Sequence, residues 1–143
     1  MAVVYPSNEW AQEWCKVVNT SQACVEAGKN WGVDFNGNFL FVLEPGSGLE
    51  KTTYVYFAYK AGECTDARLV NDPSEVDVGF SSTGPYEHFK KVVKGETDFI
   101  EVTMKGLLKL KGDFGKIMRN AKFVRAVADS IKSIPVPVTY LGE

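Results

Sequence analysis

The stretch from Met104 to Met118 reads Met-Lys-Gly-Leu-Leu-Lys-Leu-Lys-Gly-Asp-Phe-Gly-Lys-Ile-Met and connects two elements of different periodicity. Leu108 and Leu110 alternate with lysines, which is the pattern of a short strand with one buried face. Gly112 can adopt the positive φ of a tight turn, and Asp113 can cap the backbone N–H groups that follow. The stretch therefore predicts a strand that leads directly into a helix.

Extended runs precede this stretch. Residues 38–43, 52–59 and 64–70 are rich in β-branched and aromatic residues, and sequences typical of turns separate them. Residues 76–81 alternate apolar with small or acidic residues and predict a fourth strand. With the strand at 108–111, the chain is expected to form a five-stranded sheet.

Helical patterns surround these strands. Residues 1–32 predict an N-terminal helical arm in which Trp10 and Trp14 lie on one face. We expect this arm to dock on its own chain, although it can alternatively line a ligand cavity or form a dimer contact. Further helices are predicted at 83–94, where Pro85 falls in the first turn, and at 97–103.

The expected fold is α/β of the α+β type, a largely antiparallel mixed sheet covered by about five helices. A length of 143 residues fits one domain. Within it we expect the arm at 1–32, the sheet with inserted helices at 38–111 and C-terminal helices at 113–134.

Composition excludes several classes of function. The net charge of −2 gives no general attraction for nucleic acid. No segment has the length of an apolar membrane span, and the start of the chain lacks the basic residues and length of a secretory signal. We therefore expect a cytoplasmic location, with no stable membrane insertion.

The three cysteines, Cys15, Cys24 and Cys64, are expected to be reduced thiols in the core. Their odd number and their spacing do not match a metal site, and a single histidine leaves little material for one, so no metal and no cofactor is predicted.

The sequence contains no familiar catalytic motif. His88 is the only histidine, and Glu87 beside it projects about 100° away on a helix, so the two form no local dyad. Hydrolase, zinc-protease and dinucleotide signatures are absent from the sequence. Asp and Glu residues distant in sequence remain candidate catalysts, but a thioester hydrolase has no residue in its favour. The prediction is that the protein is not an enzyme.

The C-terminal half resembles the sterol carrier protein type 2 family of lipid-binding domains. That family carries an aromatic residue on a helix, a glycine six positions later, a second glycine eleven positions after that, and then a Gly-Lys-Leu-Lys-Ile-x-Gly-Asn/Asp-x-Gly signature. Phe89, Gly95 and Gly106 reproduce this spacing without a gap, and the run continues to Gly115. Two residues depart from the family pattern: Leu107 stands where the family usually has a basic residue, and Thr103 stands where it often has an aromatic residue.

The resemblance implies a non-catalytic carrier whose lipid tunnel lies between sheet and helices. The ligand would be a fatty acyl chain, an acyl-CoA or a sterol-like molecule. The alternative is an interaction module, monomeric or homodimeric, that docks to a lipid-metabolising enzyme. By this resemblance, the ligand-binding residues are expected to be Phe80, Phe89, Val92, Val93, Phe99, Ile100, Met104, Leu108, Leu110 and Met118.

Overall fold

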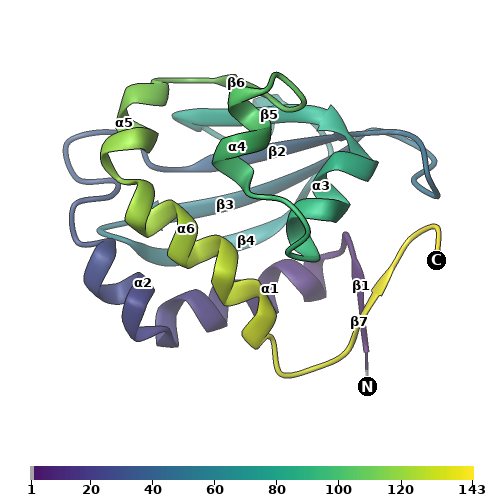
Figure 1. Ribbon diagram of the computed structural model, residues 1–143, viewed down its shortest axis with the longest axis horizontal. Helices are drawn as coiled ribbons and strands as arrows, with labels where there is room; N and C mark the ends of the chain where they lie inside the picture. Colours follow the sequence, from purple (N-terminus) through teal and green to yellow (C-terminus); the bar gives the residue numbers. More distant parts are fainter. Residues whose placement is uncertain (1) are drawn as a thin grey trace.

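A computed structural model describes residues 2–143. Figure 1 shows the main sheet with helices packed against it. In chain order the elements are β1 (Val3–Tyr5), α1 (Asn8–Thr20), α2 (Gln22–Ala27), β2 (Phe39–Glu44), β3 (Thr53–Lys60), β4 (Glu63–Val70), a 3-10 helix (Pro73–Glu75), β5 (Phe80–Pro85), α3 (Tyr86–Val93), α4 (Phe99–Met104), β6 (Lys109–Lys111), α5 (Phe114–Arg119), α6 (Ala121–Ser130), a second 3-10 helix (Ile131–Ser133) and β7 (Val138–Tyr140).

The five-stranded sheet has the order β4-β3-β2-β5-β6. Strands β2, β3 and β4 form an antiparallel meander, β5 runs parallel to β2, and β6 runs antiparallel to β5. The helices α3 and α4 are inserted between β5 and β6. The predicted α+β fold with a mixed, largely antiparallel sheet is therefore confirmed.

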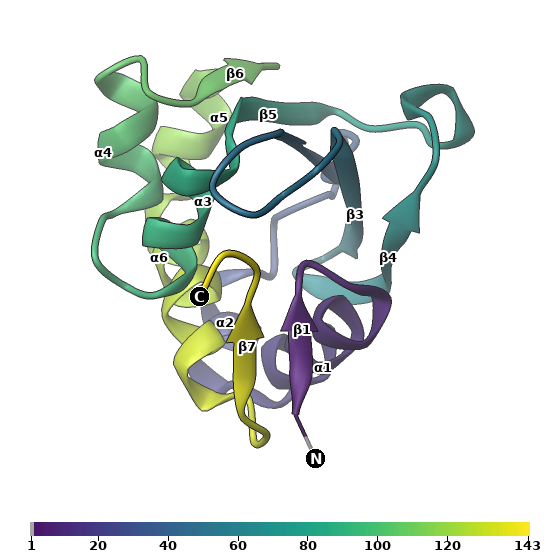
Figure 2. The ribbon, with the colours of Figure 1, turned by 90° about the vertical axis from the view of Figure 1, so that its right-hand side faces the viewer.

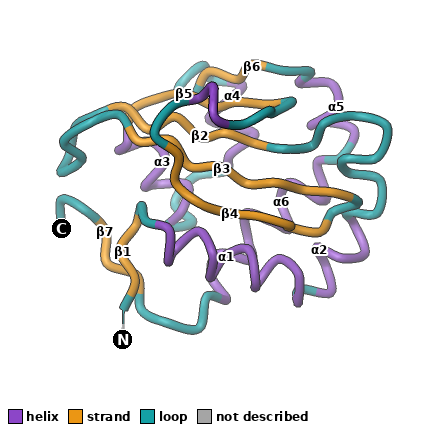
Figure 3. Tube along the Cα trace, turned by 180° about the vertical axis from the view of Figure 1, so that it is seen from behind, coloured by secondary structure: helices purple, strands orange, loops and turns teal. Residues whose placement is uncertain are grey.

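The two faces of the sheet carry different clusters. Phe39, Leu43 and Phe57 face the helices and belong to the main core. Leu40 and Tyr56 belong to a smaller cluster on the opposite face. This face of the sheet is turned toward the viewer in Figure 3. Alternation along β2 and β3 produces this division, because successive side chains of a strand point to opposite faces. The main core therefore lies between the sheet and the helices.

Side chains cap four of the helices, among them Asp113 at the predicted place. Ser7 accepts a hydrogen bond from the backbone N–H of Trp10 at the start of α1, and Ser21 caps α2 in the same way. Asp98 caps α4, and Asp113 caps α5 through the N–H of Lys116. Each cap satisfies a backbone donor that has no partner within its helix, so the caps determine where the helices begin.

The boundary between β5 and α3 differs from the prediction. We expected the strand to end at residue 81 and a helix to cover 83–94, but β5 continues to Pro85 and α3 begins at Tyr86. Residues 80–85 pair with β2 on one side, and residues 81–83 pair with β6 on the other. Tertiary pairing thus outweighs the local helical pattern. Gly84 suits this strand because a Cβ there would lie 2.6 Å from Cδ2 of Leu108.

A second, two-stranded parallel sheet was not predicted. β1 pairs with β7 in the register Val3 with Val138 and Tyr5 with Tyr140, which brings the two ends of the chain side by side (Figure 2). The strands have three residues each, too few for alternation to be recognised in the sequence.

The expectation of three reduced thiols is wrong for two of them. Cys15 of α1 and Cys64 of β4 form a disulfide, with 5.4 Å between their Cα atoms and 49 positions between them in sequence. Cys24 is free and buried, as expected. Asn19 also binds the backbone N–H and carbonyl of Cys64, so α1 is fixed to β4 at two places. The long sequence separation concealed the pairing.

Removal of this disulfide should destabilise the protein. Replacing Cys15 and Cys64 with alanine is expected to lower the free energy of unfolding by about 2–4 kcal/mol, because the unfolded chain loses a long covalent loop. Urea unfolding of the wild type with and without a reducing agent should show the same difference. The Cys24→Ala variant, which keeps the disulfide, should retain the response to the reductant. An unchanged midpoint on reduction of the wild type would contradict the assignment.

Candidate ligand cavity in the aromatic core

An apolar cavity of about 80 Å³ lies inside the main core. The sheet side of its wall consists of Phe39, Phe41, Leu43, Val55 and Tyr59. The opposite side comes mainly from helices α1, α3, α4 and α6 and includes Trp10, Trp14, Phe89, Val92, Val93, Phe99, Phe123, Val124, Val127 and Ala128. Tyr5, Trp31 and Ile131 complete the wall.

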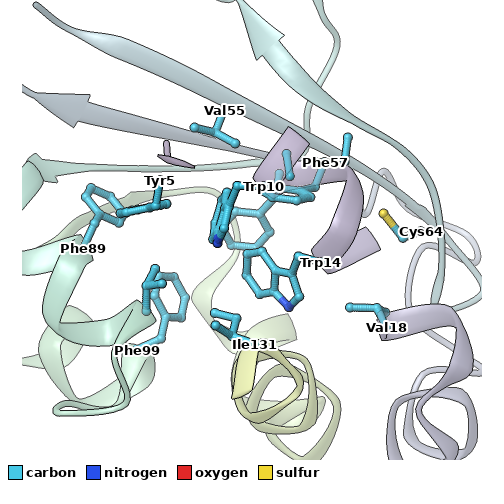
Figure 4. Packing of buried hydrophobic residues seen from close by; sticks show 14 of the residues in the cluster. Tyr5, Trp10, Trp14, Val18, Val55, Phe57, Cys64, Phe89, Phe99 and Ile131 are labelled. Carbon is cyan, nitrogen blue, oxygen red and sulfur yellow. The ribbon is translucent and has the colours of Figure 1, made fainter. Parts of the chain in front are cut away.

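Rigid aromatic rings form most of this wall. The ring of Trp14 packs edge-on against Phe57, with 4.9 Å between the centroids (Figure 4). The ring centre of Phe41 lies 5.9 Å from that of Phe89 and 6.1 Å from that of Phe99. Edge-to-face contacts hold ring centres apart and fix their orientation. Protein interiors normally have few voids larger than a water molecule, so an apolar void here indicates space for another apolar group.

Helix α4 places Phe99 at this wall. Asp98 caps the helix and lies 3.5 Å from Arg125 of α6 through its Oδ2 atom, which ties the first turn of α4 to α6. Phe99 then points to the cavity, whereas Ile100 and Val102 are buried without lining it. The cap therefore sets which side chain of the helix reaches the void.

The three tryptophans of the wall differ in their hydrogen bonds. Trp14 donates from Nε1 to Oγ of Ser130 at 2.9 Å and to the carbonyl of Val127 at 3.1 Å. Trp31 donates to the carbonyl of Gly37 at 3.0 Å. The Nε1 atom of Trp10 is buried, and no group within residues 2–143 accepts a hydrogen bond from it. One donor at the cavity is therefore unsatisfied.

The cavity wall carries no charge. Its residues are aliphatic or aromatic, and the polar groups among them are indoles and tyrosine hydroxyls. Burial raises the pKa of Tyr5 and of Tyr59 well above the usual value, so both hydroxyls stay neutral. Such a wall favours the apolar part of a ligand and disfavours an ionised group.

The C-terminal residues 138–143, which we call the strap, lie beside the cavity wall. Tyr86 of α3 stacks on Tyr5 with 5.8 Å between ring centres and donates from its hydroxyl to the carbonyl of Leu141 at 3.1 Å. The carboxylate of Glu143 lies 3.2 Å from Nζ of Lys90 and also forms an ion pair with Lys94. The strap therefore holds α3, and Phe89, Val92 and Val93 of this helix line the cavity.

Comparison with known proteins places this architecture in a family. The family model of the SCP-2 sterol transfer family matches residues 23–125. The chain belongs to the SCP-2 sterol transfer family. A search of the curated proteins gave no match.

Several solved structures share this fold. A crystal structure of sterol carrier protein 2 has 22% identity and a TM-score of 0.77, covering 90% of this chain and 97% of that one. A conserved hypothetical protein of Thermus thermophilus has 21% identity and a TM-score of 0.76, with 90% and 87% covered. The UbiJ-SCP2 ubiquinone synthesis protein has 13% identity and a TM-score of 0.53, with 88% and 90% covered. At these identities the likeness concerns the fold.

The SCP-2 resemblance led to ten expected site residues, and the structure brings four of them together. Phe89, Val92, Val93 and Phe99 line the cavity. The other six lie outside its wall. Phe80, Ile100 and Leu108 are buried, Leu110 is half-buried, and Met104 and Met118 are 67% and 42% exposed. Their role in ligand binding stays a prediction.

The N-terminal arm contributes more residues to the cavity wall than the sequence predicted. Trp10 and Trp14 are buried on their own chain, as expected, and both line the cavity, which the sequence had left as an alternative. Tyr5, Trp31 and the α6 residues were missed as wall residues. The apolar stripe of α6 was the available signal, but a stripe in the core and a stripe on a cavity wall have the same spacing.

Other kinds of site find no support within residues 2–143. No His, Cys, Asp and Glu side chains gather there in a group of three that could hold a metal ion. In the same range, no helix has the length and apolar character to cross a membrane. His88 lies with Nδ1 3.1 Å from the carbonyl oxygen of Leu107, and it is not among the residues of the cavity wall.

The strap should loosen at low pH. Hydrogen bonding and charge from Lys94 and then Lys90 lower the pKa of Glu143 below its ordinary value of 4.5. A lowered carboxyl pKa means that the contact contributes fully above pH 4.5 and is lost as the pH falls through the lower, folded-state pKa. We expect the heteronuclear ¹H–¹⁵N NOE of Gly142 to fall in that range.

The variant Glu143→Gln should show the low NOE at neutral pH and lose the pH response. Glu101→Gln is the matched control, because Glu101 pairs with Lys105 on an exposed part of α4. A pH response that survives in Glu143→Gln would contradict the assignment of the strap contact to this carboxylate.

Proposed function

We propose that the chain binds an elongated apolar lipid, such as a fatty acyl chain, an acyl-CoA or a sterol-like molecule, and carries it without changing it chemically. The observation in support is an uncharged, largely aromatic cavity between sheet and helices in a chain of the SCP-2 sterol transfer family. The cavity wall offers no acid, base or nucleophile beyond neutral tyrosine hydroxyls, so the site suits binding better than catalysis.

The energetics allow useful affinity. Burial of one methylene contributes about 0.8 kcal/mol, so a chain of about twelve carbons contributes on the order of 10 kcal/mol before ordering costs. Micromolar binding requires about 8 kcal/mol. An aliphatic chain thus has enough apolar surface to bind without a charged contact inside the cavity.

The cavity must enlarge to accept a long chain. Its volume of about 80 Å³ is smaller than a cavity that holds one benzene ring, about 150 Å³. Helix α3 lines one wall and is held by the strap through Lys90 and Lys94. We propose that movement of α3 and the strap provides the added space and the access route.

The alternative function is docking to a lipid-metabolising enzyme. Met104, Leu107 and Met118 are large apolar side chains that are exposed, and such residues favour protein contacts. A ubiquinone synthesis protein shares the fold. A carrier and a docking module differ in one respect that is simple to measure, since only the carrier requires the cavity.

A cytoplasmic location stays a prediction. The disulfide between Cys15 and Cys64 bears on it, because disulfides are rare in the reducing cytosol and common in oxidising compartments. A reducing location would leave both thiols free.

A fluorescent long-chain fatty acid should bind to the protein, and unlabelled chains should displace it. We expect micromolar dissociation constants that decrease with chain length until the enlarged cavity is full. Fluorescence titration and competition measure this. If chains of about ten or more carbons do not bind at high micromolar concentration, the carrier function is excluded.

Filling the cavity should block binding. Ala128 lines the cavity, and Ala128→Leu adds three carbon atoms at its wall. Binding of the fatty acid should weaken at least about ten-fold while the melting temperature stays equal or rises, because a void is filled. Ala126→Leu makes the same change on the same helix away from the cavity. Ala126→Leu should bind as the wild type does, and equal losses in both variants would refute the cavity as the site.

A further inference from the structure

The unsatisfied indole of Trp10 points to a feature of the ligand. All three tryptophans line the cavity, and two of them donate their Nε1–H groups to protein oxygens. The Nε1 of Trp10 is buried and has no hydrogen-bond partner within residues 2–143. Buried donors are nearly always satisfied, so an exception at a candidate binding site calls for a partner that arrives with the ligand.

The position of the Trp10 ring is fixed. Ser7 accepts the backbone N–H of Trp10 at 3.1 Å, which anchors the residue in the first turn of α1. Its ring lies 4.4 Å from the ring of Tyr5 and 5.3 Å from that of Trp14. Figure 4 shows the indole nitrogen on the side of the ring that faces Phe99 and Ile131, which are also cavity residues. The donor is therefore buried on the side of the ring where two other cavity residues lie.

The surroundings of this donor determine which acceptor fits. Its aromatic neighbours offer at most weak contacts to their π faces. An oxygen atom of a ligand would form an ordinary hydrogen bond. A carboxylate would have to be buried without a cation among the wall residues, and one neutral N–H does not compensate for that cost. A neutral oxygen satisfies the donor without burying a charge.

We propose that Trp10 is a specificity residue whose Nε1–H donates to an uncharged oxygen at the buried end of the ligand. The ligand class is then a lipid with a hydroxyl, ketone or ester carbonyl group at that end, in contrast to a plain hydrocarbon end. This inference rests on the proposed lipid-binding function and adds the polarity of the buried end.

The test compares 1-decanol with decane, which have the same chain length. Both displace the neutral fluorescent probe N-phenyl-1-naphthylamine, and the ratio of their dissociation constants is measured in the wild type and in Trp10→Phe. Phenylalanine keeps an aromatic ring but has no N–H group. The preference for decanol relative to decane should fall about ten-fold in Trp10→Phe, because one hydrogen bond is lost and the difference in hydration of the two ligands cancels between proteins.

Trp14→Phe is the matched control, because the indole of Trp14 donates to Ser130 and Val127 inside the protein. It should leave the ratio unchanged. A ratio that is also unchanged in Trp10→Phe, with both ligands bound, overturns the inference and leaves the proposed lipid binding intact. If neither ligand binds to the wild type, both the inference and the proposed function fall.

The indole signals of the wild type give a second readout that does not depend on how a variant folds. In ¹H–¹⁵N spectra, the Trp10 Nε1–H resonance should move downfield with decanol and not with decane. The Trp14 and Trp31 resonances keep their protein acceptors and should change less. Equal shifts of the Trp10 resonance with decanol and decane would overturn the inference.

Discussion

The packing of bulky aromatic rings between β2 and β3 on one side and α1, α3 and α4 on the other is the constraint on which this structure depends. Trp14 and Phe41 both pack edge-on against Phe57, and Phe41 also packs edge-on against Phe89 and Phe99. Rings of this size provide much of the apolar burial that stabilises the fold. They also adapt poorly in shape, so the same packing that forms the core leaves a void in it.

The helices that line the cavity are attached to the rest of the protein with different strength. On the side of α1, the disulfide between Cys15 and Cys64 and the two hydrogen bonds of Asn19 join helix to sheet. On the side of α3, the strap pairs with β1 through Val138–Tyr140 and is attached to the helix by the ion pairs of Glu143 and by the hydroxyl of Tyr86. Exposed ion pairs contribute little to stability, because water and salt screen the charges. The α3 side is therefore the one that we expect to move when a ligand enters.

The sequence predicts the sheet and most helix starts because those features depend on local chemistry. Asp113 caps its helix as expected, and Gly112 adopts a φ of 130° at the turn after β6. The errors occur where long-range contacts decide. Residues 82–85 become a strand because β2 pairs with all of them and β6 pairs with 82 and 83, and Cys15 is bonded to Cys64 across 49 positions.

Membership of the cavity wall was the least predictable feature. Phe99 and Ile100 are adjacent, apolar and buried, and only Phe99 borders the void. Met104 was expected at the wall from the family pattern, yet it is exposed at the end of α4. A void is determined by the space that many side chains leave empty together, and no periodicity in one segment encodes that space.

The most direct test of the central claim is to locate a bound chain by NMR. Intermolecular NOEs are measured between a ¹³C-labelled twelve-carbon fatty acid and the protein. Cross-peaks from the chain methylenes to the rings of Trp14, Phe41 and Phe99 are the predicted result, because these rings line the cavity. Cross-peaks confined to the exposed methyl groups of Met104 and Met118 would contradict the claim, since the chain would then lie on the surface.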